Sequence, residues 1–553
     1  MKEEIKQKVI EALSKEIPQI EKIKDRIKIE TPKEEKFGDF STNAAFLLSK
    51  ELKKKPLEVA SDIKNILEKE GIFEKVEVAG AGFVNLYLSN KYFLKVLEKA
   101  IVEGDIYGEI HNKDKGKVNV EFVSANPTGP LHLGHGRGAV VGNALANILK
   151  YSGYSVVKEF YINDAGRQIL KLGESIYARF RQIEEPDYPF PEDGYHGEYI
   201  KDIAKEIYLH EREKILKFTS KDEAIQWMAE YGKNLLLKKI QYDLKLLNVE
   251  FDIWTSEKEL YQQGKVQEVL EFLNKKGLIY EKDGALWLKT TLYGDDKDRV
   301  LKKSDGTYTY FAGDIAYHYD KLQRGYDKAI NIWGADHHGY FPRLKAAVMA
   351  LGADENWLEV LFIQLVKLFK EGKEVKMSKR AGEFITLRDL IEEVGADAVI
   401  YFFLSKDSNT HLNFDIDLAT KKSSDNPVFY VQYAHARITS VFREAKERFG
   451  ININEITSVD ISLLKEEIEK SIMKEIATLP EKIYTAAEQR QPHKLTNFAY
   501  ELASKLHYYY NNYKFLIDEN ENLMKARLYL LRAVRNSLRT ILKLMGIIPR
   551  ERM

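Results

Sequence analysis

Residues 118–150 combine a buried strand, a turn rich in proline and glycine, and a helix of small residues, in that order. Residues 118–123 contain alternating valines, which favour extended backbone. The prolines and the glycine of residues 124–130 end this strand before residues 134–150 continue as a helix. Residues 329–333 supply a further buried strand, which ends at Gly334. Since a strand that leads through a loop into a helix is the basic unit of α/β proteins, the middle of the chain is predicted to form an α/β, Rossmann-type domain.

The whole chain of 553 residues is too long for one hydrophobic core, and its pattern predicts three domains. Residues 1–112 predict a small α+β domain. Residues 113–416 contain the α/β domain, with a mixed, largely helical insertion at about residues 170–300. Residues 417–553 have a helical pattern almost throughout, which predicts an all-α domain.

The first domain shows local patterns of both kinds. The first fifteen residues predict an amphipathic helix, because Ile5, Val9 and Leu13 fall on one face. A second helix is predicted over residues 41–52. The alternation of residues 83–88 predicts a strand.

The composition excludes several classes of site. The chain has no cysteine, which removes disulfides, thiolate nucleophiles and zinc sites built on cysteine. Lys plus Arg and Asp plus Glu both number 85, so nucleic-acid binding must come from local basic surfaces. No apolar run approaches the roughly 18 residues of a membrane span, and no signal peptide is visible. The chain is therefore expected to be cytoplasmic, with no membrane partner.

The tetrapeptide His132-Leu133-Gly134-His135 stands where the turn gives way to the helix. A helix start presents free amide groups and a partial positive charge, which favour phosphate. Glycines 134, 136 and 138 would let a nucleotide approach the backbone, and the two histidines could reach its phosphate oxygens. The alternative is a pair of solvent-facing loop histidines. No GxxxxGKS or GxxxxGKT sequence offers a rival phosphate site.

A second basic motif, Lys376-Met377-Ser378-Lys379, stands in a stretch rich in lysine and glycine. Two lysines on either side of a hydroxyl suit the charge that develops on an α-phosphate during in-line displacement. The alternative is an ordinary lysine-rich surface loop. Together, HxGH early in an α/β domain and KMSK late in it form the paired signature of class I aminoacyl-tRNA synthetases.

The surrounding sequence resembles the arginyl-tRNA synthetase family. The similar segments are EFVSANPTGPLH at 121–132, YINDAGRQ at 161–168, WGADHHGY at 333–340 and QYAHARI at 432–438, and the resemblance extends from FGDF at 37–40 to the C-terminal residues. It implies a ligase that activates L-arginine with ATP, accompanied by Mg²⁺, and transfers the arginine to tRNA(Arg). It also implies a nucleotide-binding catalytic domain, an N-terminal domain that binds the tRNA elbow and a helical anticodon-binding domain, in a monomer.

The resemblance implies a role for each matching residue. The residues matched to the ATP site are His132, Gly134, His135, Asp336, Lys376, Met377, Ser378 and Lys379, of which the two histidines and two lysines would act in catalysis. The residues matched to the arginine site are Glu121, Ser124, Asn126, His135, Tyr310, Asp314 and His337. His337 falls where some family members have a glutamine that contacts the substrate. No metal-ligand cluster is implied.

The residues themselves support a guanidinium site at Asp314. The side chain of arginine is a planar, permanently charged fork, which carboxylates bind through paired hydrogen bonds. Tyr310 and Asp314 are four residues apart, so a helix places them on one face. Asp314 also stands among apolar and small residues, where a solvated surface carboxylate is not expected. The alternative is that Asp314 pairs with an arginine of the protein itself.

Two surfaces are predicted to contact tRNA. Arg532, Arg535 and Arg539 follow one face of the last helix, and a basic stripe suits a phosphate backbone; the alternative is a solvated helix face. Tyrosines 508–510 and Tyr513 could stack on bases, although packing in the helical core is the favoured interpretation for most of them. By resemblance, Asn85 is the candidate contact to the tRNA elbow.

Two rival functions stay open on the sequence alone. The first is another class I synthetase. The cysteinyl and methionyl enzymes commonly use cysteine-bound zinc, however, and the isoleucyl, valyl and leucyl enzymes carry large editing insertions for which this chain has no length. The second is a catalytically inactive RNA-binding paralogue, which would be expected to lose HxGH or KMSK, whereas both are intact.

Replacing Lys379 by alanine tests the second motif. Because Lys379 is expected to act on charge that is present mainly in the transition state, Lys379→Ala should lower kcat for adenylate formation by roughly 100-fold or more, with a smaller change in the KM for arginine. ATP–pyrophosphate exchange, measured with and without tRNA, reports both constants. An unchanged exchange rate would contradict the assignment.

Overall fold

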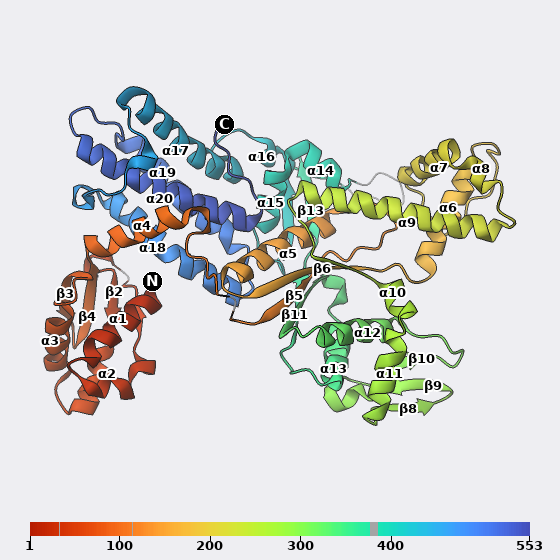
Figure 1. The fold of residues 1–553 in the computed structure, drawn as a ribbon, viewed down its shortest axis with the longest axis horizontal. Coiled ribbons are helices and arrows are strands. Elements are labelled where there is room, and N and C mark those ends of the chain that lie inside the picture. The colour runs from red at the N-terminus through yellow and green to blue at the C-terminus, as the bar shows by residue number, and fades with distance from the viewer. Residues whose placement is uncertain (33, 113, 376–384) are drawn as a thin grey trace.

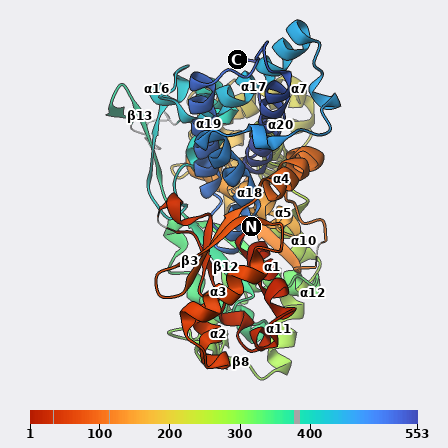
Figure 2. The same ribbon diagram turned by 90° about the vertical axis from the view of Figure 1, so that its left-hand side faces the viewer.

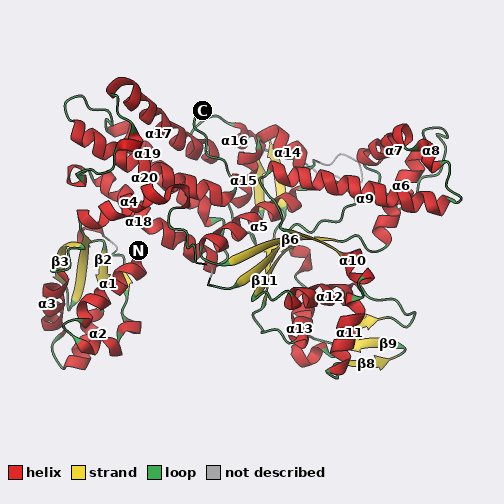
Figure 3. Cartoon of the chain, in the orientation of Figure 1, coloured by secondary structure: helices red, strands yellow, loops and turns green. Residues whose placement is uncertain are grey.

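The computed structural model of this chain describes residues 1–553 except Lys33, Lys113 and residues 376–384. Figure 1 shows a central sheet, with a small N-terminal lobe and a helical bundle on one side and the lobes formed by residues 167–246, 257–323 and 341–351 on the other. Figure 3 shows that helices dominate every part except the sheets. Within the described residues, no helix has the length and apolar character needed to cross a membrane.

The N-terminal lobe packs three helices against an antiparallel sheet. Its elements are α1 (Lys2–Ser14), β1 (Ile29–Glu30), β2 (Phe40–Thr42), α2 (Ala44–Leu52), α3 (Pro56–Leu67), β3 (Phe73–Ala79) and β4 (Phe83–Leu88), with the strands in the order β1-β2-β4-β3. The helix α1 buries Ile5, Val9 and Leu13, as their spacing predicts. The helix predicted from residue 41 begins instead at Ala44, because residues 40–42 pair with β4.

The central sheet has five parallel strands, which confirms the predicted Rossmann-type sheet. Its strands are β5 (Lys117–Glu121), β6 (Ser155–Ile162), β7 (Ile253–Ser256), β11 (Lys328–Gly334) and β12 (Leu358–Ile363), in the order β12-β11-β5-β6-β7, and α5 (Leu133–Tyr151) connects β5 to β6. From β5 the chain first builds the sheet to one side and later returns on the other. This change of direction opens a crevice between β5 and β11 at their carboxyl ends.

The predicted single insertion at about residues 170–300 is in fact interrupted, because β7 is the edge strand of the central sheet. Before β7 lie α6 (Arg167–Arg181), α7 (Glu198–His210), α8 (Arg212–Ile215) and α9 (Lys221–Leu246). After β7 lie α10 (Glu257–Gln262), α11 (Lys265–Lys275), the antiparallel strands β8 (Ile279–Lys282), β9 (Ala285–Leu288) and β10 (Arg299–Lys302), α12 (Tyr310–Gln323) and α13 (Phe341–Leu351). A strand of four residues leaves too short a pattern to be recognised in the sequence.

From residue 417 onward the chain is almost entirely helical, as predicted. A small sheet of β13 (Val366–Lys370), β14 (Lys373–Glu374) and β15 (Leu412–Asp415) accompanies α14 (Leu387–Val394) and α15 (Ala396–Leu404). The C-terminal bundle contains α16 (Ile416–Thr420), α17 (Pro427–Phe449), α18 (Glu467–Glu488), α19 (Lys494–Asn512) and α20 (Glu521–Met545). Figure 2 shows this bundle and the N-terminal lobe from the side.

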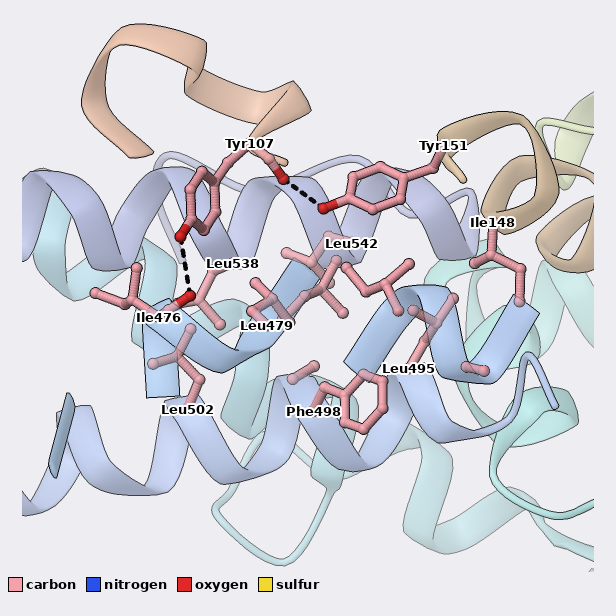
Figure 4. Packing of buried hydrophobic residues seen from close by; sticks show 14 of the residues in the cluster. Tyr107, Ile148, Tyr151, Ile476, Leu479, Leu495, Phe498, Leu502, Leu538 and Leu542 are labelled. Carbon is pink, nitrogen blue, oxygen red and sulfur yellow. Dashed lines mark hydrogen bonds between the residues drawn. The ribbon is translucent and has the colours of Figure 1, made fainter. Parts of the chain in front are cut away.

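The segment between the N-terminal lobe and the central sheet packs into the helical bundle. The helix α4 (Asn90–Glu103) contacts α18 and α20, and the Asn536 side-chain amide donates to the Ala100 carbonyl at 3.0 Å. The Tyr107 hydroxyl donates to the Ile476 carbonyl at 3.1 Å, and the Tyr151 hydroxyl donates to the Tyr107 carbonyl at 2.6 Å (Figure 4). These buried bonds join α5, the connecting segment and the bundle in one core.

A glycine brings α5 close to the sheet. A Cβ at Gly142 would lie 2.3 Å from Phe122 Cγ, which directly follows β5, so a side chain at this position has no room. Elsewhere on the same helix, a Cβ at Gly138 would meet nothing within 4 Å.

These two glycines form a matched pair for measuring the packing. Gly142→Ala is expected to lower the midpoint of thermal unfolding, because overpacking typically costs about 1–3 kcal/mol. That cost exceeds the gain of about 0.5–1 kcal/mol that alanine brings in a helix. Gly138→Ala gains the helix propensity of alanine without any steric clash, so this variant should melt at or above the wild-type temperature. Equal melting of the two variants would show that Gly142 does not set the distance between α5 and the sheet.

Candidate functional site

The crevice between β5 and β11 opens into a cleft of about 1060 Å³. Its walls come from the segments that follow β5, β6, β11 and β12, from the start of α5 and from α12. Every described residue that the sequence assigns to the ATP and arginine sites lines this cleft. These residues are Glu121, Ser124, Asn126, His132, Gly134, His135, Tyr310, Asp314, Asp336 and His337.

The two histidines of HxGH cap the start of α5 for each other. The His135 amide donates to His132 Nδ1, and the His132 amide donates to His135 Nδ1, both at 3.3 Å. The two rings stack with their centroids 3.5 Å apart. Because each Nδ1 accepts a hydrogen bond, a neutral ring carries its proton on Nε2, which suits an anionic oxygen acceptor. The motif therefore builds the helix start and also contributes to the cleft wall.

The three glycines of this helix start have different roles. Gly134 and Gly138 line the cleft. A Cβ at Gly136 would instead lie 2.5 Å from Leu387 Cδ1 of α14. Gly136 therefore permits helix packing, and the prediction that all three glycines admit a nucleotide is wrong for Gly136.

The exit of β5 has an unusual backbone. Val123 and Ser124 have φ of 68° and 40°, a region that costs about 1–3 kcal/mol for residues other than glycine. Ser124 Oγ donates to Glu121 Oε1 at 3.0 Å and accepts from the Tyr161 amide at 3.1 Å. These bonds to β5 and β6 hold the turn that carries Ser124 into the cleft.

Glu121 already has a cationic partner within the protein. Lys321, fully buried on α12, donates to Glu121 Oε2 at 2.7 Å and to Asn331 Oδ1 at 3.2 Å. Asn331 Nδ2 lies 2.9 Å from His318 Nε2. Burial lowers the pKa of His318 to about 3, so this ring is neutral and its Nε2 accepts. The charge of Glu121 is thus compensated before any ligand binds.

Asp314 has no ion-pair partner in the described part of the chain. Its Oδ2 accepts a hydrogen bond from the Tyr340 hydroxyl. Burial raises the pKa of Asp314 to about 7, and repulsion from Glu121 adds to this effect. Tyr310, one helical turn earlier, is exposed and lines the same cleft. The alternative in which Asp314 pairs with a protein arginine is therefore wrong for the described residues.

The remaining predicted residues lie at the cleft rim. Asp336 and His337 are exposed, and His337 Nε2 lies 3.7 Å from Asp336 Oδ2. Asn126 is also exposed, and its Nδ2 donates to Gln168 Oε1 at 2.7 Å. Because these three side chains are exposed, they can contact a ligand without first moving out of the protein core.

The KMSK residues Lys376, Met377, Ser378 and Lys379 lie outside the described residues. The helix that follows them, α14, begins with a backbone hydrogen bond in which the Leu387 amide donates to the Leu131 carbonyl at 2.9 Å. The start of α14 therefore lies directly beside the HxGH motif.

Three family models match consecutive parts of the chain. The arginyl tRNA synthetase N terminal domain matches residues 2–88, the catalytic domain of tRNA synthetases class I (R) matches residues 96–400, and the DALR anticodon binding domain matches residues 431–553. The chain belongs to the arginyl-tRNA synthetase family. The rival interpretation as another class I synthetase is thereby excluded.

Full-length relatives agree with this family. The chain is 48% identical over 595 residues to the arginine–tRNA ligase of Aquifex aeolicus (strain VF5), with 100% of both chains covered. It is 47% identical over 554 residues to that of Bacillus subtilis (strain 168), covering 100% of this chain and 98% of the relative. A solved structure of a putative arginyl-tRNA synthetase from Campylobacter jejuni has a TM-score of 0.78 and 39% identity, covering 84% of this chain and 100% of that chain.

In this member of the arginyl-tRNA synthetase family, the arginines predicted to bind tRNA have partners inside the protein. Arg532 donates to a backbone carbonyl at 3.2 Å. The Arg535 guanidinium lies 5.0 Å from the ring centre of Phe442, and Arg539 pairs with Asp105 at 3.4 Å. The structure therefore does not present these half-buried arginines as an open phosphate-binding stripe.

The other predicted RNA contacts divide by exposure. Asn85 lies in β4 between β2 and β3 and is only 5% exposed, so it offers little surface to a tRNA elbow. Tyr509 is buried, as the favoured interpretation predicts, whereas Tyr508 and Tyr510 are exposed. The Arg437 guanidinium lies 4.5 Å from the ring centre of Tyr510.

Sequence reasoning missed three residues of the site: Tyr340, Lys321 and Glu257. Tyr340 ends the WGADHHGY segment, so the family-like sequence did contain a signal for it. Lys321 is a lysine with no exposed surface, and only its burial reveals its role. Glu257 begins the short helix α10 after the edge strand, where no local pattern distinguishes it from a surface residue.

The raised pKa of Asp314 predicts a dependence of stability on pH. The folded state retains its proton up to a pKa of about 7, against an ordinary value of 3.8, so this carboxyl group lowers stability as pH rises from about 4 to 7. Asp314→Asn removes this effect. Since one pKa unit corresponds to about 1.4 kcal/mol, the variant should be more stable than wild type at pH 8 by up to about 4 kcal/mol, with the difference vanishing below pH 4.

Thermal unfolding from pH 4 to pH 8 measures this difference. Asp283→Asn, at an exposed turn residue, is the control and should leave the pH dependence unchanged. A wild-type pH profile in Asp314→Asn would show that the carboxyl group is not held in an unfavourable environment.

Proposed function

We propose that this chain is an arginine–tRNA ligase, whose cleft activates L-arginine with ATP before transfer to the 3′ end of tRNA(Arg), releasing AMP and pyrophosphate. The observation that carries this proposal is the joining, in one cleft, of the HxGH helix start and the uncompensated carboxylate of Asp314. The first suits the phosphates of ATP, and the second suits the cation of arginine.

The nucleotide end of the cleft would bind ATP. The start of α5 supplies its helix dipole and the residues His132, Gly134 and His135, while Asp336 stands at the rim. The arginine carboxylate attacks the α-phosphorus, and the bond to the pyrophosphate oxygen breaks. Lys376 and Lys379 would neutralise the charge that develops on the leaving group. Catalysis of this step consists of positioning and charge stabilisation, with no protein nucleophile.

The other end of the cleft would bind the amino acid. Ser124, Asn126 and His135 would hold its amino and carboxylate groups, with His337 at the rim. Asp314 and Tyr310 would receive the guanidinium from one face of α12.

Magnesium would accompany ATP and neutralise its phosphate oxygens. No group of three or more His, Asp or Glu side chains in the described ranges could hold a metal ion by itself. The phosphates of the nucleotide would therefore supply the principal ligands.

The transfer step requires tRNA. The terminal ribose hydroxyl attacks the carbonyl carbon of arginyl-adenylate, and AMP leaves. The helical bundle would bind the anticodon and the N-terminal lobe the tRNA elbow, in a cytoplasmic monomer. The boundaries at residues 112 and 416 stay a prediction, and α4 already shows that the first of them does not separate independent cores.

Arginine and citrulline test the function and the role of Asp314 together. Citrulline has nearly the shape of arginine and no charge. Asp314→Asn leaves a bound guanidinium without its partner, which typically costs about 2–5 kcal/mol. Arginine should therefore lose far more affinity than citrulline does. Tyr310→Phe removes one hydroxyl and should cost less, on the order of 1–3 kcal/mol.

For arginine, ATP–pyrophosphate exchange and tRNA charging are measured. For citrulline, the inhibition of these reactions is measured. Equal losses for the two compounds would mean that Asp314 supports the fold and does not read charge. Wild-type protein that activates none of the twenty amino acids would instead be the inactive RNA-binding paralogue.

A further inference from the structure

Arg137 is a fully buried arginine on α5, two positions after His135. It does not line the cleft. Over the part of the chain that the structure describes, its guanidinium forms no ion pair, because the neighbouring carboxylate of Asp407 lies against His493 Nδ1 instead, at 3.6 Å. Burial lowers the pKa of Arg137 to about 10, so the group keeps its charge at neutral pH. A buried cation without a carboxylate is costly, and its presence here needs a reason.

Three backbone carbonyls hold this guanidinium. Arg137 Nη1 donates to the Gln364 carbonyl at 2.9 Å and to the Thr410 carbonyl at 2.8 Å. Its Nη2 donates to the Asp407 carbonyl at 2.9 Å. Buried carbonyls require donors, and the planar fork of a guanidinium gives such bonds fixed directions. Arg137 therefore fixes two segments of backbone, both more than 200 positions away in the sequence, relative to α5.

Both segments are short links between regular elements. Residues 364–365 connect β12 of the central sheet to β13 of the small sheet, and residues 405–411 connect α15 to β15. The two links are bonded to each other, since the Gln364 amide donates to the Ser408 carbonyl at 2.9 Å. The helix α5 contacts β12, β13 and α15 (Figure 1). One side chain thus joins the HxGH helix to the point where the two sheets meet.

The first of these links forms part of the cleft wall. Gln364 and Leu365 both line the cleft, and Leu365 is exposed there. They follow β12, whereas Ser124 of the proposed arginine site follows β5, on the other side of β11. Because Arg137 bonds this link from a position so close to His135, the wall stands beside the helix start that suits phosphate. It therefore belongs to the nucleotide end of the cleft.

We propose that Arg137 is a positioning residue for adenylate formation, which holds the wall formed by Gln364 and Leu365 against the HxGH helix start and so shapes the binding site for ATP. The proposal rests on the proposed function, and Arg137 acts through the wall without touching the substrate. An apolar side chain of similar length would avoid the cost of a buried charge. It would, however, leave three carbonyls without this donor. The need to fix the wall accounts for the guanidinium, which stability alone does not.

The test compares Arg137→Met with Leu145→Ala, which alters a buried residue further along α5. In ATP–pyrophosphate exchange with tRNA present, Arg137→Met should raise the KM for ATP about tenfold and lower kcat/KM for ATP about 100-fold, as expected for a misplaced binding group. The KM for arginine should change by less than about threefold, because other strands carry that end of the cleft. Leu145→Ala should lower the melting temperature by leaving a cavity and keep both KM values at wild-type levels.

Arg137→Lys tests whether the fork itself is required. Lysine keeps the charge, but a single ammonium group on a shorter chain cannot meet three carbonyls in the geometry of a guanidinium. The KM for ATP of this variant should lie between those of wild type and Arg137→Met. Thermal shifts provide a measurement without catalysis. ATP should raise the melting temperature of wild type more than that of either Arg137 variant, whereas arginine should raise all three equally.

Three results would overturn the proposal. The first is a wild-type KM for ATP in Arg137→Met, or in Arg137→Lys if the methionine variant does not fold. The second is an equal rise in the KM values for ATP and arginine, which would mean that Arg137 supports the whole domain. The third is a similar rise in the KM for ATP in Leu145→Ala. Wild-type protein that shows no exchange with any amino acid would instead refute the proposed function itself, so the two failures are distinguishable.

Discussion

The buried ion pair between Lys321 and Glu121 holds the centre of the molecule together. Lys321 belongs to α12, Glu121 ends β5, and the same lysine also binds Asn331 of β11. One side chain therefore joins the helix to both strands that flank the crevice. A buried charge pair is costly unless its geometry and hydrogen bonds are satisfied, and here the acceptors on two strands meet that requirement. The position of Asp314, two turns earlier on α12, depends on this attachment.

The division between compensated and uncompensated charge gives the cleft its chemistry. Glu121 in the cleft wall and Asp164 nearby each have a lysine partner. Asp314 and Glu257 have none among the described residues, and both have raised pKa values. A fold selected only for stability would neutralise these two groups or replace them. Their retention in a cleft beside the HxGH helix start is what a receptor for a cationic amino acid requires.

The helical bundle and the N-terminal lobe are linked through α4 and the segment after it. Buried hydrogen bonds from Tyr107 and Asn536 join this segment to the bundle. Arg539 and Lys543 pair with Asp105 in the same region. The basic residues on this face of α20 thus mainly contact other parts of the protein. Exposed aromatic residues such as Tyr508 and Tyr510 are left as the more accessible part of the bundle surface.

The sequence by itself determined the fold class, the parallel sheet, the two strands that flank the crevice and ten residues of the cleft. The fold class and the strands leave local patterns, such as alternating valines and a glycine-rich helix start, whereas most of the cleft residues were assigned through the resemblance of their segments to a known family. The helical C-terminal part and the face of α1 followed from periodicity in the same way.

Only the tertiary structure decided how those residues are paired. The strand β7, the burial of Lys321 and Asn85, and the internal partners of the α20 arginines come from contacts between segments far apart in the chain. Glu257 and Asp314 are more than fifty positions apart, and their meeting depends on Gly313 and on the packing of α10 against α12. A charged residue looks the same in the sequence whether solvent, a lysine or an empty cleft faces it, because burial and the identity of its partner are properties of the packed chain.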